Sequence, residues 1–219
     1  MKKKQIAIVH TALATIDIMK KLINQSIPGA EIINFLDDSI LPMLMEDEDS
    51  LTYAFEKILT YARFAEKQGA AIFFNACSSI GEFKDYAKGK INIPVVRVDD
   101  AVSDMAAKEH GPIAVLATLK TTLAPSCRLL EKKCKTGTVI HPFLAEGAFD
   151  ALKSGDREKH NALIAKTVNE ALKEHGVIYL AQASMADAID KTSFPLDKKL
   201  LTSTVPAVEA LGVLYRSIM

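Results

Sequence analysis

The sequence carries no net charge and no long basic run. Its 27 lysine and arginine residues balance 27 aspartate and glutamate residues, and no basic stretch follows Lys2, Lys3 and Lys4. Nucleic acids and anionic membranes attract basic surfaces, so this even balance argues against both as partners. A small molecule is therefore the expected ligand.

Cysteine and histidine are also scarce. Cys77, Cys127 and Cys134 are an odd number of cysteines in a chain of 219 residues, which argues against a disulfide framework and predicts a reducing cytoplasm. Cys127 and Cys134 match no standard zinc spacing, and the five histidines form no H-x-x-x-H or H-E-x-x-H pattern, so we expect no metal site. No strand is followed by G-x-G-x-x-G, which argues against a dinucleotide-binding domain.

Long hydrophobic runs are missing as well. No run approaches the length of a membrane span. The apolar segment Ile6–Val9 ends at His10 and is too short for the hydrophobic region of a signal peptide, so we interpret it as the first strand. The remaining composition is ordinary, with 49% hydrophobic and 25% charged residues, which is enough to bury one large core or two small ones.

The stretch Ile72–Glu82 carries the strongest chemical signal. Its short apolar run ends abruptly in small polar residues, which predicts a buried strand that delivers Asn75, Cys77 and Ser78 to a strand-to-helix turn. In α/β proteins such turns often carry the functional residues. We therefore place the candidate site here.

Ser79 and Glu82 have the spacing of a capping box, which predicts a helix that begins at Ser79. The positive end of that helix would favour the thiolate of Cys77 over the thiol, and would make it the most reactive of the three cysteines. The alternative is that Cys77 is a buried cysteine that only fills the core.

The first half of the chain alternates apolar runs of strand type with helical periodicity. Strands are expected at 6–9, 31–36, 70–76 and 94–98, with helices at 15–25, 51–68 and about 99–110. Asp37–Ser39 and Pro42 are expected in a loop. Such alternation predicts a parallel sheet with helices on both faces.

The second half repeats this pattern. Ile113–Thr118 aligns with Ile6–Thr11 at an offset of 107 residues, and Gly176–Ser184 aligns with Ala70–Ser78 at an offset of 106. A further strand is expected at 200–203, and helices at 122–134, 145–152, 156–175 and from about 206.

These observations predict an α/β protein with two pseudo-symmetric lobes. Each lobe is expected to hold a mostly parallel four-stranded sheet with helices on both faces. We expect the first lobe to contain residues 1–104 with 205–219 and the second to contain 105–204. Corresponding strand ends of two such lobes would face each other, so the predicted ligand cleft lies between them.

Three segments carry a family resemblance. Asn75–Ser79 is similar to a first cysteine motif, Val115–Thr121 to a second-lobe strand motif, and Leu180–Met185 occupies the place of a second cysteine motif. Together they resemble the aspartate/glutamate/hydantoin racemase superfamily over nearly the whole chain. The resemblance implies two α/β lobes, no cofactor and a homodimer, which is the assembly that this family commonly forms.

The resemblance also implies roles for individual residues. It makes Cys77 the general acid/base at the α-carbon of a small carboxylate or amino acid, which backbone N–H groups and hydroxyls would hold. The implied binding residues are Thr11, Asn75, Ser78, Ser79, Thr118, Thr121, Gln182 and Ser184, of which Thr11 is included only through the internal repeat. Each hydroxyl has an alternative role as a helix N-cap, and His10 is more typical of a structural histidine than of an acid or base.

The second cysteine of the family pattern is missing. Racemisation by two bases needs a proton-transfer group on each face of the α-carbon, because a single base returns the proton to the side it came from. The family motif places Gln182 at that position and the internal repeat places Ala183, and neither is an acid or base at neutral pH. A decarboxylase or cis-trans isomerase with one cysteine, and a non-catalytic carboxylate-binding protein, are therefore alternatives to a racemase.

Overall fold

The chain forms two compact α/β units. The computed structural model describes residues 4–190, 192 and 194–218, so Lys2 and Lys3 lie outside the described residues. Unit 1 contains the residues up to Val98 and from Thr204 onward, and unit 2 contains Asp99–Ser203. Within the described ranges, no helix has both the length and the apolar character that crossing a bilayer requires.

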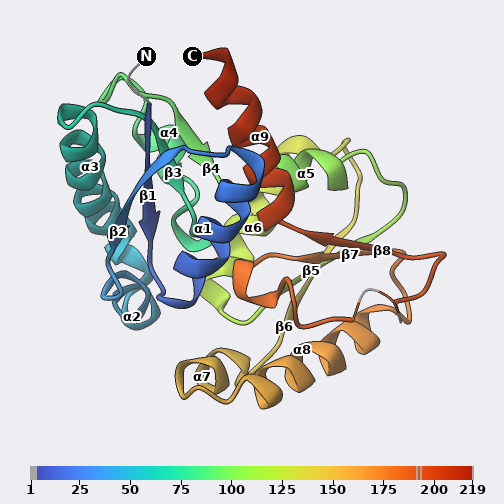
Figure 1. The fold of residues 1–219 in the computed structure, drawn as a ribbon. Helices are drawn as coiled ribbons and strands as arrows, with labels where there is room; N and C mark the ends of the chain where they lie inside the picture. The colour runs from blue at the N-terminus through green and yellow to red at the C-terminus, as the bar shows by residue number, and fades with distance from the viewer. Residues whose placement is uncertain (1–3, 191, 193, 219) are drawn as a thin grey trace. The chain divides into compact units, whose positions relative to one another are not determined.

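Unit 1 is built on a four-stranded parallel sheet with the strand order β2-β1-β3-β4. Figure 1 shows its elements in blue to green and its last helix in red. In chain order the elements are β1 (Gln5–His10), α1 (Ala14–Ser26), β2 (Glu31–Leu36), α2 (Ile40–Glu46), the 3-10 turn η1 (Glu48–Ser50), α3 (Leu51–Lys67), β3 (Ala70–Asn75), the 3-10 turn η2 (Ser78–Ile80), α4 (Phe83–Tyr86), β4 (Val95–Arg97) and α9 (Thr204–Ser217).

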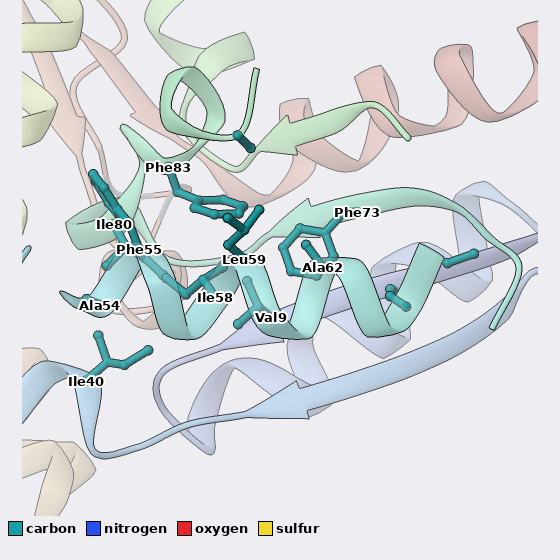
Figure 2. Close-up of a cluster of buried hydrophobic side chains, with 14 of the residues drawn as sticks. Val9, Ile40, Ala54, Phe55, Ile58, Leu59, Ala62, Phe73, Ile80 and Phe83 are labelled. Carbon is teal, nitrogen blue, oxygen red and sulfur yellow. The ribbon is translucent and has the colours of Figure 1, made fainter. Parts of the chain in front are cut away.

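One face of this sheet packs on α3. Successive strand residues point to opposite faces, so Val9 and Phe73 share one side of the central strands. They belong to a cluster of buried side chains that includes Ile58 and Ala62, which lie one helical turn apart on α3 (Figure 2). The other face is covered by α1, which packs on α9 and buries Met19 completely.

A buried carboxylate ties the end of β2 to α3. Asp37 accepts hydrogen bonds from the Tyr61 hydroxyl at 2.7 Å and the Ser39 hydroxyl at 2.5 Å, and it forms an ion pair with Lys57 at 2.7 Å. Burial alone raises the pKa of Asp37, but the hydrogen bonds from Lys57, Ser39 and Tyr61 outweigh it and lower the pKa to about 2. The same contact and burial raise the pKa of Tyr61 to about 12.

Unit 2 has a second four-stranded parallel sheet, with the order β6-β5-β7-β8. Its elements run from green to orange and red in Figure 1. They are α5 (Asp100–Ala106), β5 (Ile113–Ala117), α6 (Lys120–Lys133), β6 (Ile140–Leu144), α7 (Ala148–Lys153), α8 (Arg157–Ala171), β7 (Val177–Leu180), the 3-10 turn η3 (Ala183–Met185) and β8 (Lys199–Thr202).

The two faces of the second sheet bury separate clusters. Val115 of β5 packs with Leu130 of α6 on one face, and Leu116 packs with Ile164 of α8 on the other. All four side chains are completely buried. Burial of each side chain contributes about 1.5–3 kcal/mol, which explains why β5 is a continuous apolar run and does not alternate with polar residues. Two four-stranded parallel sheets with flanking helices confirm the predicted fold class.

Two elements differ from the sequence prediction. Residues Ile40–Glu46 form α2, where a loop through Pro42 was expected, because the first turn of a helix leaves N–H groups unpaired and tolerates proline there. The strand β6 was not located in the sequence, since its segment Ile140–Leu144 contains Pro142 and an exposed histidine. Proline is tolerated in β6 because this strand lies at the edge of the sheet.

The pairing register corrects the internal repeat. Ile6 pairs with Ile72 in unit 1, and Ile113 pairs with Val177 in unit 2. The corresponding central strands β1 and β5 are therefore 107 residues apart, as the sequence predicted, but β3 and β7 are 105 apart and not 106. A shift of one residue moves every side chain of a strand to the other face, so the register decides which residues correspond.

Candidate active site

Thr11 and Cys77 follow the carboxyl ends of β1 and β3, the two central strands of unit 1. β1 and β3 pair in parallel, and at these ends the N–H of Ala76 donates to the carbonyl of Val9 at 3.1 Å. The Thr11 side chain consequently lies within hydrogen-bond distance of the Cys77 sulfur. Two residues predicted for one site are thus brought together.

Four donors surround the Cys77 sulfur. Hydrogen bonds reach it from the side chains of Thr11 and Ser79 and from the backbone N–H groups of Ser79 and Ile80. Each of these donors favours the thiolate. Burial outweighs them and raises the pKa of Cys77 above the ordinary value of a thiol. The protein therefore holds a neutral thiol among groups that stabilise its anion.

The helix predicted to begin at Ser79 does not form, and the predicted capping box is wrong. Ser79 lies inside the turn η2, Glu82 precedes α4, and neither η2 nor α4 has a side-chain cap hydrogen bond. The helix α4 has only four residues, so the macrodipole that was expected to lower the pKa of Cys77 is small. Direct hydrogen bonds take its place, and the net shift is upward.

The other two thiols lie on and at the end of α6. Burial, followed by the charge of Glu131, raises the pKa of Cys127 to about 11, and burial raises that of Cys134. All three thiols are consequently less acidic than a free cysteine. The four donors at its sulfur are what distinguish Cys77.

Asn75 supports the loop that carries Cys77. Its side chain is completely buried at the end of β3. The Oδ1 atom accepts the N–H of Cys77 at 3.0 Å, and the Nδ2 atom donates to the carbonyl of Ile80 at 2.9 Å. Both ends of the amide are therefore engaged within the loop, which makes Asn75 a positioning residue for the thiol.

Arg97 packs beneath the same loop and was not singled out in the sequence. It ends β4 beside Asn75 and is only 4% exposed. A Cβ atom added to Gly81 would lie 2.5 Å from the Arg97 guanidinium, so glycine is required for this close approach. The signal in the sequence was a single arginine in the apolar segment Pro94–Val98. The predicted binding residues Ser78 and Ser79 are also buried in this loop.

His10 is a structural residue. It is completely buried, and its ring nitrogens lie 2.8 Å from Thr15 Oγ1 and 3.0 Å from Asn34 Oδ1. Burial lowers the pKa of His10 and favours the neutral imidazole. This histidine joins β1, α1 and β2 by hydrogen bonds.

Thr118 and Gln182 occupy the corresponding strand ends of unit 2. Thr118 follows β5 as Thr11 follows β1, and Gln182 precedes the turn η3 as Cys77 precedes η2. The Gln182 Oε1 atom accepts the backbone N–H of Thr118 at 2.5 Å and its hydroxyl at 2.8 Å. Of the two positions proposed for the missing cysteine, the offset of 105 selects Gln182 and excludes Ala183.

Thr121 lies in the first turn of α6. Its Oγ1 atom is buried and has no hydrogen-bond partner among the residues that the structure describes. The N-cap residue Leu119 provides no side-chain cap hydrogen bond to this helix. A hydroxyl in this setting can bind a ligand oxygen, which is consistent with the predicted role of Thr121.

Ser184 lies in η3, two residues after Gln182. Its carbonyl is 3.4 Å from Nε2 of His160, whose Nδ1 is 2.8 Å from the carbonyl of Ala148. His160 is completely buried and so connects η3 to the start of α7. The sequence did not indicate this supporting histidine, because it lies near the start of α8 and has no motif around it.

In unit 1 the structure places four of the predicted residues beyond the carboxyl ends of the central strands: Thr11, Cys77, Ser78 and Ser79. In unit 2 it places Thr118 beside Gln182. The ligand cleft predicted between two lobes stays a prediction. Within the described part of the chain, no three histidine, cysteine, aspartate or glutamate side chains gather in a way that could hold a metal ion.

The chain has two parallel sheets of matching strand order, and polar groups follow the central strands of each. These features are typical of one class of enzyme. The family model for Asp/Glu/Hydantoin racemase matches residues 6–211. The protein therefore belongs to this family and is an enzyme of the racemase and isomerase class. A comparison with curated proteins finds no match.

Solved structures of racemases share the fold. The chain is similar to glutamate racemase isoform RacE1 from Bacillus anthracis, with 16% identity and a TM-score of 0.76 over 100% of this chain and 84% of that one. It is also similar to glutamate racemase from Francisella tularensis in complex with D-glutamate (17% identity, TM-score 0.78, 100% and 83% covered). For allantoin racemase from Pseudomonas fluorescens the values are 18% identity and a TM-score of 0.70, with 99% and 92% covered.

Proposed function

We propose that this protein is a cofactor-independent isomerase that acts at the α-carbon of a small carboxylate or amino acid, with Cys77 as its general acid/base. The observation that carries the proposal is the set of four hydrogen-bond donors at the Cys77 sulfur. Such donors stabilise the negative charge that a thiol acquires each time it gives up its proton. Family membership supports a substrate of the aspartate or glutamate type.

The chemistry requires the thiol to cycle between two states. As the thiolate, Cys77 removes the α-proton and becomes neutral while the substrate becomes a carbanion. As the thiol, it returns a proton to that carbon and becomes a thiolate again. The Thr11 hydroxyl and the N–H of Ile80 donate to sulfur and lower the cost of the thiolate state.

We propose that the carboxylate of the substrate binds beside Cys77, at the carboxyl ends of β1 and β3. Ser78 lies in the loop that carries Cys77 and has a hydroxyl and a backbone N–H group, which are the kinds of donor that a carboxylate needs, whereas Thr11 and Ser79 donate to the sulfur.

A second candidate function is decarboxylation by one cysteine. Here the bond from the α-carbon to a carboxylate breaks, neutral carbon dioxide leaves, and the electron pair of that bond stays on the α-carbon as a carbanion. Cys77 protonates this carbanion, becomes a thiolate and regains its proton from water. One observation favours it: burial raises the pKa of Cys77, which supplies a neutral thiol that can donate its proton. The family resemblance adds that Gln182, which transfers no proton near neutral pH, occupies the position of the second cysteine motif.

The pH dependence of the rate separates these two reactions. A thiol with a raised pKa has a thiolate fraction that grows about tenfold per pH unit below that pKa. Proton abstraction by the thiolate should therefore accelerate by about 100-fold over the two pH units from 7 to 9. Protonation by the neutral thiol should be almost independent of pH over the same interval.

The test is to incubate D- and L-aspartate and D- and L-glutamate with the enzyme in D₂O and to follow the α-proton by NMR. Malonate derivatives with one α-substituent serve as decarboxylation substrates, followed by release of carbon dioxide. The variant Cys134→Ser provides the matched control, because it removes a thiol from the end of α6 and should leave both rates unchanged. A Cys77→Ser variant as active as the wild type would refute the proposal, and tight binding without turnover would indicate a carboxylate-binding protein.

A further inference from the structure

His141 and His175 form a contact within unit 2 that takes no part in the proposed reaction. His141 lies in the edge strand β6 and is exposed, whereas His175 lies four residues after the end of α8 and is buried. The Nδ1 atom of His141 is 2.6 Å from the Nε2 atom of His175, which is hydrogen-bond distance. The contact therefore joins the edge strand to the segment that follows α8.

The strand β6 is paired on one side only. Within the described sheet it pairs with β5, and Pro142 has no backbone N–H to donate. Its apolar residues Ile140, Phe143 and Leu144 are half-buried, so burial stabilises it less than the completely buried β5. The ring of Phe143 also packs edge-to-face on His175, with 5.4 Å between the ring centroids. His175 is therefore expected to contribute measurably to the attachment of β6.

The partners of His175 show where its proton lies. Its Nδ1 atom is 2.8 Å from the carbonyl oxygen of Ala171, and a carbonyl oxygen can only accept, so Nδ1 carries a proton. In the neutral ring Nε2 is then an acceptor, and it receives the Nδ1–H of His141. One proton thus lies between the two rings, and the Nε2 atom of the exposed His141 is left unprotonated.

This contact can accommodate one additional proton but not two. A first proton binds at Nε2 of His141 and leaves the hydrogen bond between the rings in place. A second proton turns Nε2 of His175 into a donor, so that two N–H groups and two positive charges face each other across 2.6 Å. The hydrogen bond is then lost. Histidine is the side chain whose charge changes under mildly acidic conditions.

We propose that His141 and His175 form a pH-sensitive contact, which holds β6 beside α8 while at least one of the two rings is neutral and releases it when both are protonated. The contact lies within unit 2 and contains no residue of the proposed active site. Its test needs no substrate, so failure of the proposed function leaves it standing, and its own failure leaves the proposed function standing.

The charged groups on the elements around the pair do not neutralise a second proton. Glu170 of α8 and the following Lys173 and Glu174 are exposed, and the residue of β5 that pairs with His141 is Ala114. The helix α6 packs on the opposite face of the sheet. Among the described residues, neither histidine forms an ion pair with any of these groups.

NMR titration and hydrogen exchange test the contact. The imidazole C–H signals of His141 and His175 give the pH at which the second ring becomes protonated. Below that pH the protection factors of the β6 amides, which correct for the intrinsic pH dependence of exchange, should fall by about tenfold or more in the wild type. The amides of the central strand β7 should keep their protection.

His141→Gln separates this role from a merely structural one. Its amide can donate to the neutral ring of His175 and can accept from the protonated ring, so β6 should stay protected on both sides of that pH. His110→Gln, at an exposed histidine of unit 2, is the matched control and should lose protection as the wild type does. The proposal is overturned by a wild type whose β6 protection does not change, by a second ring that stays neutral until the protein unfolds, or by a His141→Gln variant as acid-sensitive as the wild type.

Discussion

The two units share a strand order and differ at the residue that follows the third strand in each. Unit 1 has Cys77 there, and unit 2 has Gln182, each hydrogen-bonded to the threonine that follows the neighbouring central strand. The backbone geometry at the two strand ends is therefore similar, although the cysteine can transfer a proton and the glutamine cannot. What the difference teaches is that the fold of unit 2 does not depend on a thiol at this position, whereas racemisation by two bases needs a second proton-transfer group.

A second difference concerns the edge strand of each sheet. Asp37 follows β2, donates its N–H to the carbonyl of His10 and anchors Lys57 and Tyr61. Ala145 follows β6 and donates its N–H to the carbonyl of Ala117 in the same way, but it has no carboxylate. Of these two corresponding residues, Asp37 alone therefore has a carboxylate that acid can protonate.

The largest expected effect comes from making unit 1 resemble unit 2. Cys77→Gln removes the proposed acid/base and should lower the rate of α-proton exchange by at least about 1,000-fold, because an amide cannot transfer the proton. NMR in D₂O measures the rate, and the thermal midpoint shows whether the variant is folded. Exchange within tenfold of the wild type in a folded variant would contradict the role of Cys77.

Corresponding core residues test whether the two sheets are equally well packed. Phe73 of β3 and Ile178 of β7 are completely buried at equivalent positions. We expect Phe73→Ala to lower the free energy of unfolding by about 3–5 kcal/mol and Ile178→Ala by about 2–5 kcal/mol. Urea denaturation gives both values, and Leu13→Ala, at an exposed position, should change the stability little. A loss below 1 kcal/mol at either core site would show that the packing is looser than described.

The Asp37 corner predicts a difference in acid sensitivity. Because the folded pKa of about 2 lies below the ordinary 3.8, its stabilisation is fully present above about pH 4 and is lost as the pH falls toward 2. Asp37→Asn should lower stability at pH 7 by about 1–2 kcal/mol and should remove this part of the acid dependence. Urea unfolding at pH 7 and pH 3 measures it, with exposed Asp38→Asn as the control. Equal pH dependence in Asp37→Asn and wild type would contradict the assignment.

The smallest effects come from the paired threonines. Thr11→Val and Thr118→Val each remove one hydroxyl donor and should each lower stability by about 1 kcal/mol. Only Thr11→Val should raise the pKa of Cys77 further and slow its alkylation, by a few-fold, because Thr118 donates to Gln182. Iodoacetamide labelling with peptide mapping measures the rates. Equal slowing in both variants would show that the hydroxyl does not act on the thiol directly.

Much of the fold could be predicted because its central strands are continuous apolar runs bounded by breakers. β1, β3, β5 and β7 are buried on both faces, and that burial produces the apolar runs that identify them in a sequence. The edge strand β6 was missed because only a strand at an edge can hold Pro142, and edge position is a property of the assembled sheet.

The position of the candidate residues at the ends of strands could be predicted from the sequence, but their geometry could not. Matching apolar strands in a sequence does not establish their register. The internal repeat therefore aligned Ala183 with Cys77, whereas the pairing of β7 with β5 shows that Gln182 corresponds to it, as the family motif had placed it. The capping-box spacing of Ser79 and Glu82 arose without a helix, since a 3-10 turn uses the same residue types. Supporting side chains such as Arg97 act through packing, which leaves no motif.

The contact between Gly81 and Arg97 constrains how this enzyme can vary. Any side chain at position 81 would overlap the buried guanidinium, and either Arg97 or the loop that presents Cys77 would have to shift to relieve it. The two positions are therefore expected to covary among relatives: those with a side chain at position 81 should have a shorter residue at position 97. Sequence variation in the loop that carries Cys77 is thus limited by β4, a strand with no residue that is proposed to act in catalysis.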